Sequence, residues 1–136
     1  MPRRRYVAAV AVFLAAAPVG CSNRDSAAAR APRETGTVSA RPGSDGTQQV
    51  VIAGNEQFRF VPSTIRAKAG RLRIVLTNSG TTPHNLQVDG AGQAGFTGLV
   101  GAGERAQVTV SLTPGRHRFV CTLHTRLHMV GTIVVS

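Results

Sequence analysis

The sequence has few cysteines, few acidic residues and no long helical pattern. Cys21 and Cys121 are the only cysteines among 136 residues, so the chain can form one disulfide at most. Six Asp and Glu residues face 16 Lys and Arg residues, which gives a net charge of +10. No stretch repeats apolar residues with the 3.6-residue period of a helix, which argues against a helical domain. The length has room for one domain.

The N-terminus has the features of a secretory signal peptide. Arg3, Arg4 and Arg5 precede an apolar stretch over 6–20, which is shorter than the roughly 20 residues of a membrane-spanning helix. The stretch ends at Cys21 in a pattern that resembles a bacterial lipobox, although Pro18 stands where Leu is usual. We expect residues 1–21 to be a leader and Cys21 to carry a lipid that anchors the protein in the extracytoplasmic cell envelope. The alternative is a secreted or periplasmic form without lipid.

A change of composition follows the leader. Residues 22–47 are mostly Ala, Arg, Gly, Pro, Ser and Thr, with Val38 as the only large apolar residue. Such a segment buries too little surface to offset its ordering entropy, so we expect a flexible linker before a domain at 48–136. Loss of the three leader arginines lowers the net charge from +10 to +7. Export argues against nucleic acid as the partner of this basic chain and favours an anionic membrane or an acidic protein. A merely solvated basic face is the alternative.

Short runs of alternating apolar and polar residues predict an all-β domain. The expected extended segments are 50–52, 58–65 with a break at Pro62, 71–77, 84–88, 106–112, 116–121 and 129–135. Short strands separated by Gly and Pro favour a sandwich or a barrel. Gly90, Gly92 and Gly95 form a GxGxxG pattern, but it lacks the strand-to-helix context of a dinucleotide site. We therefore expect residues 89–103 to be a glycine-rich loop.

A thiol, an imidazole and a thioether lie within nine residues, at Cys121, His124 and Met129. Alternation along a strand turns Cys121 toward the apolar side, and it turns His84 inward while Asn85 takes the opposite face. The strands on either side of residues 121–129 must be antiparallel, so two nitrogen and two sulfur donors can meet at one end of the domain. Copper suits one thiolate with imidazoles and a weak thioether, whereas structural zinc rarely takes a thioether.

Two further histidines are weaker candidates. His117 lies four residues before Cys121, roughly 13 Å away along a strand, so we expect it at the other end of the domain. His128 precedes an inward Met129 and should face solvent, although it remains an alternative axial ligand. With four histidines in all, the chain has too few for the additional copper centres of an oxidase or a nitrite reductase. We expect no enzymatic activity.

These residues resemble those of the cupredoxins, in particular the small blue-copper proteins of the plastocyanin and pseudoazurin type. The resemblance covers about residues 50–136 and rests on Phe58, Phe60, Pro62, Gly70, Asn78, Pro83, His84, Asn85, Cys121, His124, Met129 and Gly131. It implies a Greek-key β-sandwich or barrel that binds one copper ion. His84, Cys121 and His124 would be the equatorial ligands, and Met129 the long axial one.

The resemblance also implies roles beyond the ligands. Asn85 would tie the two ligand loops together and influence hydrogen bonding at the sulfur. The protein would be a monomer that carries single electrons by Cu(II)/Cu(I) cycling. The acidic patch of plant plastocyanins is absent, so the redox partner is expected to present an acidic docking surface. An envelope protein that binds and delivers copper would use the same ligands, and this alternative stays open.

Overall fold

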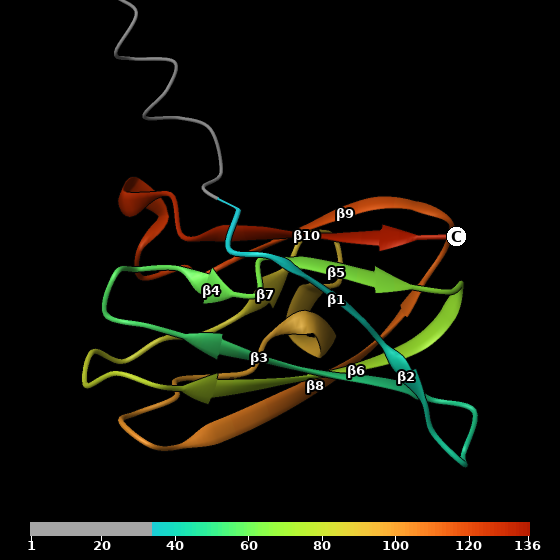
Figure 1. Ribbon diagram of the computed structural model, residues 1–136, viewed down its shortest axis with the longest axis horizontal. Helices are drawn as coiled ribbons and strands as arrows, with labels where there is room; N and C mark the ends of the chain where they lie inside the picture. Colours follow the sequence, from blue (N-terminus) through green and yellow to red (C-terminus); the bar gives the residue numbers. More distant parts are fainter. Residues whose placement is uncertain (1–33) are drawn as a thin grey trace, which may run out of the picture.

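The computed structural model describes residues 34–136, which form two β-sheets packed face to face (Figure 1). In spatial order, the first sheet contains β1 (Thr37–Ser39), β5 (Thr64–Ala67), β10 (Val130–Val135), β9 (Gly115–Val120) and β7 (Gln87–Val88). The second contains β2 (Arg41–Pro42), β3 (Gln48–Gly54), β6 (Gly70–Asn78) and β8 (Arg105–Leu112), with β4 (Phe60–Val61) also paired to β3. Two short 3-10 helices complete the described chain, η1 (Gly92–Gly95) and η2 (Thr125–Leu127). The prediction of an all-β sandwich is confirmed.

Strand directions bring four loops to one end of the sandwich. β3 and β6 are parallel, so both finish at that end, and β8 starts there because it runs antiparallel to β6. β9 finishes and β10 begins at the same end, joined by a loop that contains η2, at the left of Figure 1. Gly131 of β10 lies opposite Phe119 of β9, where a Cβ would overlap the Phe119 ring, so this close pairing requires glycine.

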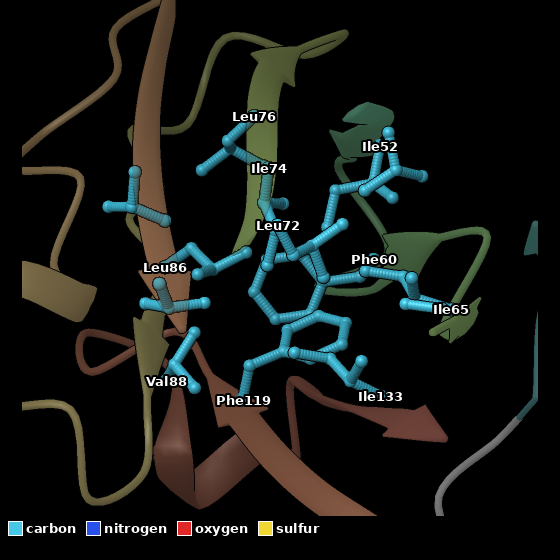
Figure 2. Close-up of a cluster of buried hydrophobic side chains, with 14 of the residues drawn as sticks. Ile52, Phe60, Ile65, Leu72, Ile74, Leu76, Leu86, Val88, Phe119 and Ile133 are labelled. Atoms are coloured by element: carbon cyan, nitrogen blue, oxygen red, sulfur yellow. The ribbon is translucent and has the colours of Figure 1, made fainter. Parts of the chain in front are cut away.

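The core lies between the sheets and follows directly from the alternation in the sequence. In β6, Leu72, Ile74 and Leu76 are fully buried, whereas Arg73 and Val75 between them point to the other face. Phe60 and Phe119 meet at the centre with their ring centroids 4.9 Å apart (Figure 2). Each such side chain contributes about 1.5–3 kcal/mol to folding when it is removed from water. This core fixes the two sheets that carry the loops.

The fold begins earlier in the chain than the sequence predicted. β1 and β2 lie within residues 22–47, so the part of this segment from Thr37 onward belongs to the sandwich and is no linker. β1 pairs in parallel with β5, from Thr37 opposite Thr64 to Ser39 opposite Arg66, and Val38 packs against the core. Backbone pairing at a sheet edge needs little apolar sequence, which is why composition missed it. The predicted leader, its Cys21, and residues 22–33 lie outside the described residues.

The segment 84–88 also differs from its prediction. Only Gln87 and Val88 form a paired strand, and His84 makes a single isolated bridge to Val100. Asn85 was predicted on the outward face, yet it is buried, because the loop after β9 covers it. The glycine-rich loop over 89–103 is present and contains η1. Within residues 34–136, no helix has the length and apolar character needed to cross a membrane.

Candidate metal centre

Backbone hydrogen bonds hold His84 at the end of the sandwich where the four loops meet. Its N–H donates to the Val100 carbonyl (3.1 Å), and its carbonyl accepts from the Val100 N–H (2.8 Å). The side chain is fully buried, and within residues 34–136 neither ring nitrogen makes a hydrogen bond of good geometry, although the Asn55 backbone lies near enough to the ring to favour its protonated form. Burial, followed by repulsion from His124, lowers the pKa of His84 from its ordinary value of 6.5. The imidazole is therefore neutral at neutral pH, which is the form that binds a metal.

The loop between β9 and β10 places Cys121, His124 and Met129 through its own backbone bonds. The Cys121 N–H donates to the Met129 carbonyl (3.0 Å), and the N–H groups of His124 and Met129 donate to the carbonyls of Cys121 (3.2 Å) and His124 (3.3 Å). η2 forms a tight 3-10 turn within the loop. It ends at His128, whose backbone is left-handed with a φ of 55°. These bonds fix the spacing of the three side chains.

His84, Cys121 and His124 come together as one cluster. One donor atom from each lies within 4.8 Å of the other two, and the Cys121 sulfur is 3.4 Å from His124 Nδ1. Bonds from a metal ion to nitrogen and sulfur are about 2.0–2.3 Å long, so small side-chain adjustments would let a single ion contact all three. The donor set fits an ion that accepts both thiolate and imidazole.

Met129 has the right placement to add a fourth donor. It is fully buried, and its carbonyl accepts the Cys121 N–H. The register of β9 and β10 pairs Val120 with Val130, so the same register places Met129 opposite Cys121. Residues opposite each other in an antiparallel pair present their side chains to the same face. Met129 therefore lies on the same face as the cysteine.

Asn85 links the loop after β9 to the loop that carries His84. Its side-chain oxygen accepts from the Thr122 N–H (2.8 Å), and its side-chain nitrogen donates to the Thr122 hydroxyl (2.8 Å). Its backbone N–H points at the Cys121 sulfur, 3.5 Å away. The two-loop bridge that the family resemblance implied is thus present, together with a donor to the sulfur.

The other two histidines lie elsewhere, as predicted. The His117 ring is hydrogen-bonded to the Thr113 carbonyl (2.8 Å), which lies between β8 and β9 at the end of the sandwich opposite the cluster. His128 is exposed, outside the cluster formed by the other imidazoles and the thiol. The axial alternative at His128 has no support in this arrangement.

The sequence analysis assigned no role to three residues at the end of β3 and just after it, namely Gly54, Glu56 and Phe58. The Phe58 ring lies against His124 (centroids 4.7 Å apart) and edge-on to His84 (6.5 Å). Its φ of 55° is uncommon for a bulky residue. Gly54 lies against the His84 ring, and the Glu56 carboxylate binds the turn before His84. The Phe58-x-Phe60 spacing was visible in the sequence, but these contacts join segments that lie 26 to 66 residues apart.

Gly54→Ala is expected to destabilise the site. A Cβ at this position would lie 2.8 Å from His84 Cδ2 and 2.9 Å from Cγ, so the imidazole must move. Overpacking of this kind costs about 1–3 kcal/mol, which urea unfolding of the metal-free protein measures. Gly101→Ala is the matched control, because its Cβ meets only the flexible end of Glu104. Equal effects of the two substitutions would contradict the packing role of Gly54.

Acid is expected to destabilise the metal-free protein through His84. Its pKa is lowered in the folded state, so the unfolded chain binds the proton more readily. The free energy of unfolding therefore falls as the pH drops below about 6.5, where the unfolded imidazole begins to protonate. Urea unfolding at pH values on either side of 6.5 measures the fall. His84→Gln should make the free energy of unfolding depend less on pH, whereas the control His117→Gln should not change this dependence. An unchanged dependence in His84→Gln would contradict its assignment to His84.

Comparisons with known proteins agree with this architecture. The family model of the cupredoxin-like domain matches residues 9–135. A dithionite-reduced auracyanin from the photosynthetic bacterium Roseiflexus castenholzii is 17% identical, with 65% of this chain and 96% of that chain covered and a TM-score of 0.55. Auracyanin B is 18% identical, with 65% and 88% covered and a TM-score of 0.54. These identities are low, so the two structures support the fold alone. No curated protein matches the sequence. The length of the family match shows that the chain belongs to the cupredoxin-like family.

Proposed function

We propose that the protein is a type 1 (blue) copper protein that carries single electrons, with one copper ion held by His84, Cys121, His124 and Met129. The observation that carries the proposal is the cluster of His84, Cys121 and His124, in which His84 and Cys121 are buried and neither ring nitrogen of His84 makes a hydrogen bond of good geometry within residues 34–136. A buried polar group without a partner costs free energy, and a bond to a metal would offset that cost. The neighbouring thiol and thioether favour copper among the metals of the first row.

The roles of the protein side chains follow from their contacts. Copper, when bound, supplies the one-electron change between Cu(II) and Cu(I). Cys121 and Met129 are soft donors that favour Cu(I), and the two imidazoles favour Cu(II). The Asn85 N–H stabilises negative charge on the cysteine sulfur. The bonds between residues 121, 124 and 129 hold the donors in place, so little has to move when an electron arrives or leaves.

Met129→Gln is expected to retain the visible colour and to lower the reduction potential. The colour comes from the thiolate, which the substitution leaves in place, while an amide oxygen is a harder donor than a thioether and favours Cu(II). Absorption spectra and voltammetry of the copper-loaded variant measure the two effects. His128→Gln is the control, because His128 is exposed. A potential at or above that of the wild type would contradict the assignment of Met129.

The alternative function is copper delivery, and exchange kinetics separate the two. An electron carrier should lose Cu(II) slowly to an excess of chelator and should be reduced and reoxidised quickly and reversibly. A delivery protein should release the ion readily. The buried position of His84 and Cys121 favours slow release. Rapid loss to EDTA, together with sluggish reduction, would contradict the electron-transfer proposal.

For docking, the proposal includes a redox partner with an acidic surface. Three exposed leucines lie next to residues of the site. Leu123 and Leu127 (each 53% exposed) belong to the loop that carries Cys121 and His124, and Leu99 (63% exposed) precedes Val100, which pairs with His84. His124 is partly exposed beside them, and Arg126 of η2 is exposed. A positive protein attracts anionic partners at low ionic strength. An anionic redox reagent should therefore oxidise the protein faster than a cationic one, and salt should reduce the difference.

For location, the proposal is the extracytoplasmic envelope with a lipid on Cys21. The arginines, the apolar stretch and the position of Cys21 support it. Labelled fatty acid should be incorporated by the wild type and not by Cys21→Ser when the gene is expressed in a bacterial host. Absence of label in the wild type would favour the secreted or periplasmic form.

A further inference from the structure

An exposed carboxylate binds the turn that leads into His84. Glu56 lies in the turn after β3, and its Oε1 accepts the Thr82 N–H (2.8 Å), the Thr81 N–H and the Thr81 hydroxyl (3.2 Å). Its Oε2 accepts the Thr82 hydroxyl (3.0 Å). The backbone donors of Thr82 and then Thr81 lower the pKa of Glu56 from 4.5 to about 2. The carboxylate is therefore ionised throughout the neutral range.

The same turn is held from its inner side by Asn78. The Asn78 side-chain nitrogen donates to the carbonyls of Thr82 (2.8 Å) and Val100 (3.1 Å), and its oxygen accepts the Gly80 N–H (2.9 Å). Asn78 is buried and Glu56 is exposed. The turn over residues 79–83 is thus hydrogen-bonded to Asn78 on its buried side and to Glu56 on its exposed side.

The backbone of His84 follows this turn directly, so the turn helps to place its ring. A ligating histidine is commonly oriented by a hydrogen bond from its second ring nitrogen. Within residues 34–136, neither nitrogen of His84 makes a hydrogen bond of good geometry, and the nearest candidate is the backbone of Asn55, the residue before Glu56. Its ring lies against Gly54, the Asn55 backbone and Phe58. Gly54 and Phe58 flank Glu56 in the same loop region, so one short segment supports both the ring and the turn.

We propose that Glu56 is a positioning residue of the metal centre: its carboxylate holds residues 81 and 82 so that His84 keeps its place whether or not copper is bound. The proposal rests on the copper function proposed above. It predicts that loss of the carboxylate loosens the turn in the metal-free protein and speeds the escape of copper from the loaded protein. The first effect does not depend on copper at all.

Hydrogen exchange of the metal-free protein tests the turn itself. In Glu56→Ala the amides of Thr81 and Thr82 lose their acceptor, and we expect them to exchange about tenfold faster than in the wild type. Glu56→Gln keeps an acceptor oxygen and should restore most of the protection. Asp45→Ala is the matched control, because Asp45 accepts the Thr47 N–H (3.0 Å) in the turn before β3, at the other end of that strand. Unchanged exchange at Thr81 and Thr82 in Glu56→Ala would overturn the proposal.

Copper release tests whether the turn positions the ligand. The copper-loaded Glu56→Ala protein should lose Cu(II) to EDTA severalfold faster than the wild type, with an altered visible band, whereas Glu56→Gln and Asp45→Ala should match the wild type. Gly80→Ala gives an independent variant, because its Cβ would overlap the Glu56 carboxylate and displace it without removing its charge. We expect it to resemble Glu56→Ala.

The outcomes separate this proposal from the function on which it rests. Faster exchange at Thr81 and Thr82 with wild-type copper release and spectrum would overturn the positioning role. If both Glu56→Ala and Gly80→Ala speed exchange and copper release while Glu56→Gln restores both, the role is supported. A wild-type protein that binds no copper would overturn the proposed function together with the positioning role, and hydrogen exchange would still show whether Glu56 holds the turn.

Discussion

Replacement of Cys121 by serine is expected to abolish the intense visible absorption of the Cu(II)-loaded protein. The absorption of a blue site arises from charge transfer between a thiolate sulfur and Cu(II), and a serine oxygen cannot replace that sulfur. Cys121 is fully buried, 3.4 Å from His124 Nδ1, and receives the Asn85 N–H. The Cys121 sulfur is therefore placed to bond the proposed copper ion as a thiolate.

The sequence offers a matched control for this substitution. Cys21 is the only other cysteine in the chain, and it lies in the predicted leader. Cys21→Ser should leave the visible band unchanged in position and intensity. Retention of the band in Cys121→Ser, or its loss in Cys21→Ser, would contradict the assignment of Cys121 as the thiolate ligand.

Copper(II) is expected to raise the stability of the folded protein by several kcal/mol. A ligand that binds only the folded state adds about 4.1 kcal/mol at a free concentration 1,000 times its dissociation constant. For a domain of 60–100 residues, each 1 kcal/mol corresponds to roughly 4–8 °C in Tm. The ring nitrogens of His84 make no hydrogen bond of good geometry in the described part of the chain, which strengthens the expectation, because metal binding would relieve a cost that the metal-free protein carries.

Differential scanning calorimetry with and without Cu(II) measures this stabilisation. His84→Ala should lose most of the copper-dependent rise in Tm, and His128→Ala should keep it, since His128 is exposed. A Tm that does not respond to Cu(II), or one that responds equally in His84→Ala, would contradict the proposed ligand set.

Local patterns in the sequence predicted the features that depend on local rules. Alternation along β6 identified Leu72, Ile74 and Leu76 as core residues, because a strand half-buried in a sandwich must alternate. The same parity correctly turned Cys121 inward, and the spacing from Cys121 to Met129 placed the loop at a strand junction. His84 is buried as expected but not through strand alternation, because it forms only an isolated bridge and its neighbour Asn85 is buried too.

The features that were missed depend on contacts between distant segments. β1 is held by backbone pairing to β5, and backbone pairing leaves little mark on composition. Asn85 is buried because a loop 37 residues further along the chain covers it. Glu56 binds a turn 25 residues away, and an exposed glutamate gives no sign of such a partner in the sequence. These contacts become visible only when the loops are assembled at one end of the sandwich.

The central claim is that His84, Cys121, His124 and Met129 form a type 1 copper site. The most direct test is the visible and electron paramagnetic resonance spectra of the protein after addition of one equivalent of Cu(II). We predict an intense visible band from the thiolate and a Cu(II) resonance with the narrow hyperfine splitting of a blue site. A colourless protein that is fully loaded with Cu(II) would contradict the claim.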